Sequence, residues 1–273
     1  MAPRSPLMNV TVNAVLKAAR QLRRDFVEVE QLQVGFKGPA NFVSEADMRA
    51  QETLFQELTR GRPDWGFTGE ESGHARSMPA GGSRWIVDPL DGTTNFLHGI
   101  PHFCISVAAE VEGELTTAVV YDPTRDELFW AERGRGAFLN QRRLRVSGRR
   151  QLKEALIGTG IPFLGWGQHD RFQGEIGRVM GQVAGIRRMG AAALDLAWVA
   201  AARLDGFWER DLHPWDVAAG ILLIREAGGF ATEIGGGKQA LEGGSIVAAN
   251  DHLIGPLDTL LAGPQITEKR AVG

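Results

Sequence analysis

The sequence predicts a layered α/β protein, in which alternating α and β layers build one compact two-lobed unit. Two observations support this fold class. Two amphipathic helices precede a run of antiparallel strands in the first half, which is an α+β arrangement. From about residue 147 strands and helices alternate, which is typical of an α/β arrangement. No repeat or long linker separates the lobes, about 7–146 and about 147–262, so we expect a single domain over residues 1–273.

Two helices open the chain. Apolar residues recur at helical spacing at Val15, Ala18, Ala19, Leu22 and Phe26, and the opposite face carries basic side chains that we expect to be solvated. The second helix follows residue 44, with Ala46, Ala50, Leu54 and Leu58 on one side. Ser44 is the expected N-cap, and Asp47, three residues later, fits a capping box.

Strands follow in both lobes. Runs at 65–68 and 85–87 precede a hairpin of 105–111 and 115–121, and 126–133 and 137–139 continue the sheet. Pro89 and Gly92 are expected to end the strand at 85–87. In the second lobe we expect strands at 155–158, 186–189, 206–209 and 245–249, and helices at 171–183, 191–202, 215–227 and 251–261.

Composition excludes several classes of protein. Hydrophobic residues make up 43% and charged residues 23% of the chain, so a globular core is expected rather than disorder. A net charge of −3 gives no field that attracts nucleic acid, which we do not expect as the main partner. The single Cys104 excludes a disulfide framework within the chain. No apolar stretch is long enough to span a membrane, and a cytoplasmic enzyme is expected.

The most informative segment is Trp85 to Phe96, WIVDPLDGTTNF, which places two carboxylates on a tight turn at a strand end. Asp88 and Asp91 cannot both stay ionised in a half-buried turn unless a cation shares them, because like charges raise one another's pKa. Hard oxygen ligands without a histidine or cysteine pair favour Mg²⁺ or Ca²⁺, and Mg²⁺ commonly binds substrate phosphates as well. The alternative is an ordinary polar β-turn.

Two further acidic stretches favour the metal site over the turn. Gly69-Glu70-Glu71-Ser72 lies upstream, and His213-Pro214-Trp215-Asp216-Val217-Ala218-Ala219-Gly220 lies downstream. With these three motifs in this order, the chain resembles the inositol monophosphatase family of Mg²⁺-dependent, lithium-sensitive phosphatases, from about Leu7 to about Leu260. The resemblance implies a layered fold of the sugar-phosphatase type.

The resemblance also implies a metal site. Glu70, Asp88 and the Leu90 carbonyl match the ligands of a first Mg²⁺, and Asp88, Asp91 and Asp216 match those of a second, with a third ion as a further option. Asp216 alone could instead complement a helix dipole, since it falls in the first turn of a helix. Glu71 is expected to be a supporting or solvated charge. Li⁺ is the expected inhibitor.

The remaining site residues divide into catalytic and binding groups. The resemblance implies that Thr93 and Asp47, with Glu70, activate the attacking water. Substrate is expected to meet Asp91, Gly92, Thr93, Glu209 and the segment Gly190, Ala191 and Ala192. Gly190 to Ala192 could be close packing, or a helix N-terminus whose free N–H groups receive oxygens. Glu209 could be a surface charge. His98, His102 and His213 lack ligand spacing and are expected to be loop or packing residues.

The expected activity is hydrolysis of inositol 1-phosphate by a water nucleophile. The same site could instead act on histidinol phosphate, 3′-phosphoadenosine 5′-phosphate or fructose 1,6-bisphosphate. A third alternative is a regulatory protein of this fold that binds RNA or RNA polymerase. The sequence departs from the family at Asn41, where aspartate is usual, which removes one negative charge near the site entrance. A homodimer is implied by the resemblance.

Overall fold

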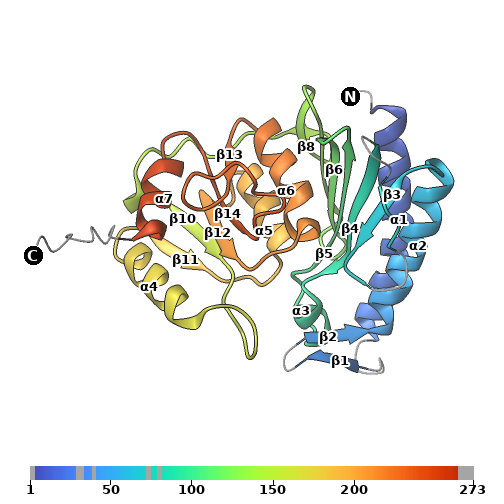
Figure 1. The fold of residues 1–273 in the computed structure, drawn as a ribbon, viewed down its shortest axis with the longest axis horizontal. Coiled ribbons are helices and arrows are strands. Elements are labelled where there is room, and N and C mark those ends of the chain that lie inside the picture. The colour runs from blue at the N-terminus through green and yellow to red at the C-terminus, as the bar shows by residue number, and fades with distance from the viewer. Residues whose placement is uncertain (1–3, 29–33, 39–40, 72–74, 79–81, 264–273) are drawn as a thin grey trace, which may run out of the picture.

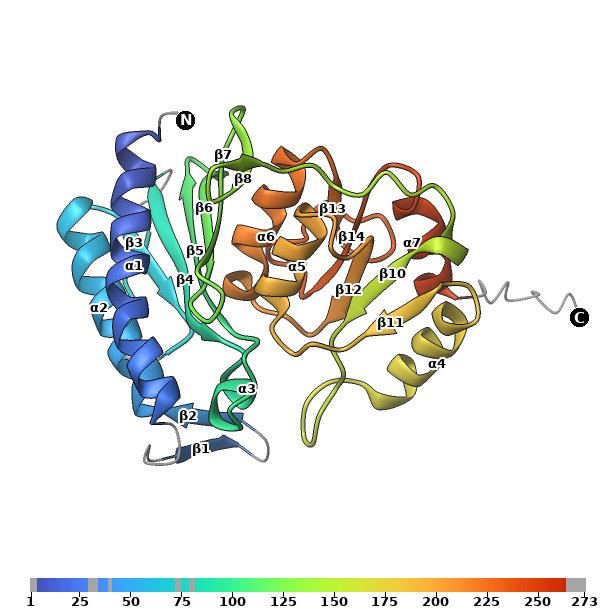
Figure 2. The same cartoon turned by 180° about the vertical axis from the view of Figure 1, so that it is seen from behind.

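The computed structural model describes residues 4–28, 34–38, 41–71, 75–78 and 82–263, and for 34–38 and 41–44 it describes the backbone alone. Five layers follow one another across the molecule: helices, a sheet, helices, a second sheet and helices (Figure 1). The reverse view shows the same succession (Figure 2). The predicted layered α/β fold is therefore confirmed.

The helices occupy three layers. Helices α1 and α2 form one outer layer, α5 and α6 form the central layer, and α4 and α7 form the other outer layer (Figure 1). The short α3 begins within the segment 85–96, which we call the central motif. The bounds are α1 Pro6–Val27, α2 Glu45–Gly61, α3 Thr93–Leu97, α4 His169–Met180, α5 Ala192–Ala200, α6 Pro214–Glu226 and α7 Ile254–Ala262, with a 3₁₀ turn at Leu152–Glu154.

The first sheet has the strand order β3-β4-β5-β6-β7-β8-β9. Its strands are β3 Gly66–Gly69, β4 Ser83–Asp91, β5 Cys104–Val111, β6 Glu114–Asp122, β7 Glu127–Glu132, β8 Gly136–Leu139 and β9 Arg142–Arg143. Only the β3–β4 pair is parallel. The predicted hairpin between β5 and β6 is confirmed, and Glu112 (φ 53°) with Gly113 (φ 79°) gives it two left-handed central residues, as a type I′ turn requires.

The second sheet has the order β11-β10-β12-β14-β13. Its strands are β10 Leu156–Thr159, β11 Gly185–Arg187, β12 Gly206–Arg210, β13 Phe230–Thr232 and β14 Ser245–Ala249. Strand β10 is parallel to both of its neighbours, β11 and β12. The chain leaves β10 through α4 to reach β11, and returns through α5, on the opposite face, to reach β12. Such a reversal opens a crevice at the carboxyl ends of the two central strands, where ligands of α/β proteins commonly bind.

One prediction about the central motif is wrong. Pro89 does not end the strand, because β4 continues to Asp91. The register shifts between Asp88, which pairs with Ser106, and Asp91, which pairs with Cys104, so Pro89 and Leu90 form a bulge opposite one residue of β5. Proline is tolerated in bulges, because its nitrogen does not have to donate a hydrogen bond to the neighbouring strand there. The prediction that Gly92 ends the strand is correct, since α3 begins at the next residue.

The predicted apolar faces of α1 and α2 are buried in the structure. Val15, Ala18, Ala19 and Leu22 of α1 are buried. The apolar residues of α2 pack in the same cluster, against the buried Trp85 of β4. The antiparallel pair β1 Val34–Gly38 and β2 Asn41–Ser44 was not expected. The side chains of Ser44 and Asn41, on which two predictions rest, lie outside the described residues.

A second, larger cluster belongs to both sheets. It joins Ile86 and Ala108 of the first sheet with Phe207 and Ile246 of the second, and α5 and α6 fill the space between them. Because both lobes bury apolar side chains in the same core, neither lobe completes that core alone. Within the described ranges, no helix has the length and apolar character that crossing a membrane requires.

Candidate active site

A cavity of about 580 Å³ opens where the two lobes meet, and it is lined by residues of both. Nearly all of the sequence-predicted site residues lie on its wall: Glu70, Asp88, Leu90, Asp91, Gly92, Thr93, Gly190, Ala192, Glu209 and Asp216. Two others lie behind the wall: Ala191 is buried at the N-cap of α5, and Asp47 of α2 lies behind Thr93. The fold thus brings together segments more than a hundred residues apart in the sequence.

The bulge of β4 presents Asp88 to the cavity. Asp88 is only 2% exposed, and one of its oxygens accepts a hydrogen bond from the Leu90 amide at 2.9 Å. Burial raises the pKa of this carboxyl well above its usual range, and the nearby carboxylates of Glu70, Asp91 and Asp216 raise it further. A cation would relieve both effects, because it restores the favourable electrostatic environment that burial removes.

Asp91 meets the first turn of α5. Its Oδ2 accepts hydrogen bonds from the amides of Ala193, at 2.7 Å, and Leu194, at 3.4 Å. These amides favour the ionised carboxylate, but burial, Asp216 and Asp195 act in the opposite direction and raise the pKa of Asp91 to about 8. The Asp91 carboxylate is therefore fixed in position by the two amides, but they do not compensate its negative charge fully.

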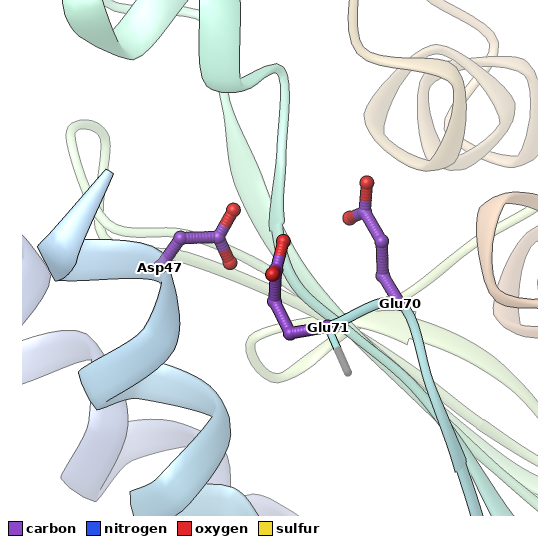
Figure 3. A group of neighbouring side chains, drawn as sticks. All are labelled: Asp47, Glu70 and Glu71. Carbon is purple, nitrogen blue, oxygen red and sulfur yellow. The ribbon is translucent and has the colours of Figure 1, made fainter. Parts of the chain in front are cut away.

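A second group of carboxylates lies beside the bulge. Oxygen atoms of Asp47, Glu70 and Glu71 lie within 4.8 Å of one another. Asp47 projects from α2 toward Glu71, and the two glutamates follow β3 (Figure 3). Glu71 is buried, and its backbone is held by the Gln51 side chain in two hydrogen bonds. Of the two roles expected for Glu71, supporting or solvated, the solvated one is wrong, because Gln51 of α2 draws this segment into the interior.

The donor set fits a hard divalent cation. Every acidic group described so far offers carboxylate oxygens, and Leu90 lines the cavity together with Glu70, Asp88 and Asp91. Cys104 lies near, with its Sγ 3.6 Å from Asp91 Oδ2, but burial raises the pKa of its thiol well above the ordinary value. A protonated thiol is not a metal ligand. Oxygen donors of this kind suit Mg²⁺ better than Zn²⁺.

Thr93 begins α3 at the edge of the bulge. Its hydroxyl donates to the Leu90 carbonyl at 2.9 Å, and Asp47 Oδ2 lies 3.5 Å away, which is long for a hydrogen bond. The turn requires glycine at position 92, where φ is +90° and a Cβ would meet the His102 carbonyl at 3.0 Å and Ala191 at 3.1 Å. Residues 92 and 191 therefore touch across the two lobes.

Asp216 is both a helix-capping residue and a residue of the cavity wall. It lies in the first turn of α6, and its Oδ2 accepts a hydrogen bond from the His213 amide at 2.7 Å, so it closes a capping box. It also lies on the cavity wall, close enough to influence the pKa of both Asp88 and Asp91. The cap fixes this carboxylate at the rim of the acidic cluster.

Sequence reasoning missed three features around the cavity. His102 and Asp195 form a buried hydrogen bond of 2.9 Å, and Asn95 donates to the carbonyls of His102 (2.7 Å) and Met189 (2.8 Å). The connection from β10 to α4 supplies exposed apolar side chains to the cavity, among them Phe163 and Trp166. No local pattern indicates the first two features. His102 and Asp195 lie more than ninety residues apart in the sequence, and so do Asn95 and Met189. His102 is a packing residue, as expected.

The layered fold and its cluster of buried carboxylates define a metal-dependent phosphatase. The profile of the inositol monophosphatase family matches residues 4–263, and the chain belongs to that family. The inositol-1-monophosphatase of Rhizobium meliloti (strain 1021) is 59% identical over 96% of this chain and 98% of its own length. The Nus factor SuhB of Pseudomonas aeruginosa is 46% identical over 91% of this chain and 93% of its own. The crystal structure of extragenic suppressor protein suhB from Bartonella henselae superposes with a TM-score of 0.91 at 52% identity, covering 95% of this chain and 99% of the other.

Proposed function

We propose that this protein is a Mg²⁺-dependent phosphomonoesterase that hydrolyses inositol 1-phosphate to inositol and phosphate. The observation that carries the proposal is the cavity in which the carboxylates of Asp88, Asp91 and Asp216 share a wall with Glu209. The acidic cluster supplies the place for metal and phosphate. Glu209, on the second sheet, supplies a hydrogen-bond acceptor for a hydroxyl-rich leaving group. Similarity to the inositol-1-monophosphatase of Rhizobium meliloti supports the choice of substrate.

Two metal positions are proposed. Glu70, Asp88 and the Leu90 carbonyl would hold one Mg²⁺, and Asp88, Asp91 and Asp216 would hold the other, so that Asp88 is common to both. Bound Mg²⁺ supplies positive charge to the phosphate oxygens and lowers the pKa of coordinated water. A third, weaker position is left open by the family resemblance. Among the described residues the buried Glu71 and Asp47 offer further oxygens beside Glu70.

The chain's own residues orient the nucleophile and bind the phosphate. Thr93 and Asp47, together with Glu70, hold the attacking water and accept its proton. General-base catalysis of this kind raises the rate by about 10²–10⁴-fold. Gly92 and Thr93 line the cavity, and their backbone amides would donate to the charge that develops on phosphate. The segment Gly190 to Ala192 lies against this turn and borders the leaving group.

The experiment is a phosphate-release panel with the purified protein and Mg²⁺. We expect kcat/KM for inositol 1-phosphate to exceed that for histidinol phosphate, 3′-phosphoadenosine 5′-phosphate and fructose 1,6-bisphosphate. A higher value for one of those three would transfer the proposal to that substrate. Absence of Mg²⁺-dependent phosphate release on all four would contradict a phosphomonoesterase.

A regulatory role is the second candidate. The relative from Pseudomonas aeruginosa, 46% identical, bears the name Nus factor SuhB. A site retained only for its fold would not need so many buried carboxylates around one cavity, since each one is destabilising without a cation. Turnover and a regulatory role are nevertheless compatible in one protein, and pull-down with RNA polymerase or RNA from the source cell would test the second.

Four finer features belong to the same proposal. We propose inhibition by Li⁺, a homodimer, a cytoplasmic location and a single domain that unfolds as one unit. The core shared by the two sheets supports the single domain. The homodimer is what the family resemblance implies.

A further inference from the structure

The place of the Glu209 carboxylate is not explained by hydrogen bonds. Glu209 lies near the end of β12, at the crevice between the carboxyl ends of β10 and β12. Among the hydrogen bonds of the described residues, none holds this carboxylate. The charges around it mostly repel it, since Asp216, Asp195 and Asp91 are acidic and Arg188 alone is basic. Another feature must therefore decide where this side chain lies.

That feature is the surface of the neighbouring strand. In the parallel pair of β10 and β12, Thr159 is opposite Trp208, so Gly160 comes next to Glu209. The Glu209 carboxyl group occupies the space above Gly160: a Cβ on residue 160 would overlap Oε1, Cδ and Oε2 of Glu209 together. No other glycine among those described in the structure is covered in this way by a carboxylate that lines the cavity.

The backbone does not require glycine at this position. Gly160 is absent from the residues with positive φ, so an L-residue can adopt its conformation without strain. The clashing atoms are the end of a long, partly exposed side chain, which can rotate away. An alanine here would consequently be accommodated by movement of Glu209 rather than by movement of a strand.

We propose that Gly160 is the position that determines polyol specificity in this protein, because its missing side chain leaves the space that the Glu209 carboxylate occupies at the cavity wall. A side chain of any kind at residue 160 displaces that carboxylate and removes the acceptor for a substrate hydroxyl. The inference rests on the proposed function for the role of Glu209. Gly160 is a positioning residue, since it acts through Glu209.

The test is a double-mutant cycle of Gly160→Ala and Glu209→Ala, with kcat and KM measured for inositol 1-phosphate and for 2-glycerophosphate, which has no ring. Loss of a hydrogen bond to a charged group corresponds to about tenfold to a hundredfold. We expect Gly160→Ala to raise KM for inositol 1-phosphate by a factor in that range, to leave kcat near wild type, and to change the 2-glycerophosphate constants by less than about twofold. In the Glu209→Ala background the same substitution should have no effect on either substrate.

Gly255→Ala in α7 is the matched control, because a Cβ there meets nothing within 4 Å and the residue is not among those that line the cavity. It should behave as wild type. If Gly160→Ala fails to fold, the double variant should fold, since the overlap is with the Glu209 side chain alone. Failure of both variants to fold would overturn the inference.

Three further results separate this inference from the proposed function. A KM unchanged by Gly160→Ala but raised by Glu209→Ala would overturn the inference alone, as would effects that multiply in the double variant. Equal losses on inositol 1-phosphate and 2-glycerophosphate in Glu209→Ala would overturn the polyol assignment. In that case a crystal structure of Gly160→Ala still decides the geometric claim: a displaced carboxylate supports it, and an unmoved one contradicts it.

Discussion

Asp91 Oδ2 accepts a hydrogen bond of 2.7 Å from the amide of Ala193, and this contact joins the bulge of β4 to the first turn of α5. The two residues belong to different lobes. The N-terminus of a helix favours a negative charge. Burial and the neighbouring Asp216 and Asp195 nevertheless raise the pKa of Asp91 to about 8. The site is thus arranged for ionised carboxylates but needs added positive charge to hold them ionised at neutral pH.

The first prediction concerns the pH dependence of stability. The pKa of Asp91 rises from 3.8 to about 8 in the fold, so between these values the folded state binds more protons than the unfolded state. Stability of the metal-free protein should therefore fall as pH rises through this interval. Mg²⁺, which binds the ionised form, should raise the Tm more near the upper end of the interval than near the lower end.

Thermal unfolding in EDTA and in Mg²⁺ across this interval checks the prediction. Asp91→Asn removes one titrating carboxyl, so its metal-free Tm should fall less steeply with pH. A metal-free Tm that climbs steadily with pH over the same interval would show that these carboxylates are not electrostatically strained.

How far the sequence predicts this fold depends on how local each feature is. The apolar periodicity of α1 and α2 and the left-handed pair Glu112-Gly113 are local, and the structure confirms the corresponding helices and hairpin. The prediction that Pro89 ends the strand was wrong, because a bulge depends on the register of the partner strand and cannot be recognised in the sequence of one strand alone. The short β13 has three residues and offers too little pattern to be recognised.

The candidate site divides in the same way. Carboxylates adjacent in the central motif were predictable, because like charges so close in a buried turn require a cation. A supporting and a solvated role both stayed open for Glu71, because only the contact with Gln51 shows which way this segment of the chain turns. The pair of His102 and Asp195 and the overlap of Gly160 with Glu209 depend on strand and helix packing across the fold, so one sequence could not indicate them.

A second prediction addresses Thr93, whose hydroxyl lies between the Leu90 carbonyl and Asp47. Removing the hydroxyl in Thr93→Ala should lower kcat by about 10²-fold or more, as loss of a positioned proton acceptor does, with KM nearly unchanged. Steady-state phosphate release measures both. Thr53→Ala, which removes a hydroxyl from the exposed face of α2, is the control and should match wild type. A kcat for Thr93→Ala within about twofold of wild type would remove Thr93 from the mechanism.

Lithium provides a third prediction. The family resemblance implies that Li⁺ occupies the second metal position while phosphate is still bound. Inhibition should consequently be uncompetitive, or nearly so, with respect to inositol 1-phosphate. Initial rates at several fixed Li⁺ concentrations give the pattern, with K⁺ as the ionic-strength control. Full activity at Li⁺ concentrations far above that of Mg²⁺ would count against the second position.

A fourth prediction separates recognition from chemistry. Glu209 lines the cavity on the side of the second sheet, whereas the bulge carboxylates belong to the first. Glu209→Ala should lower kcat/KM for inositol 1-phosphate by roughly tenfold to a hundredfold, mostly through KM, because the contact is made equally in the ground and transition states. Loss on 2-glycerophosphate should be much smaller. Equal losses on both substrates would mean that Glu209 supports the fold or the metal site.

The most direct test of the account is the Mg²⁺-dependent rate of Asp88→Asn on inositol 1-phosphate. Asp88 is proposed to bind both ions, and asparagine keeps the size of the side chain while it removes the charge. With a fold shown intact by circular dichroism, the variant should lose on the order of 10³-fold or more in kcat, because metal catalysis supplies several kcal/mol. A folded variant whose rate stays within about tenfold of wild type, a loss below about 1.4 kcal/mol, would contradict the proposed metal site.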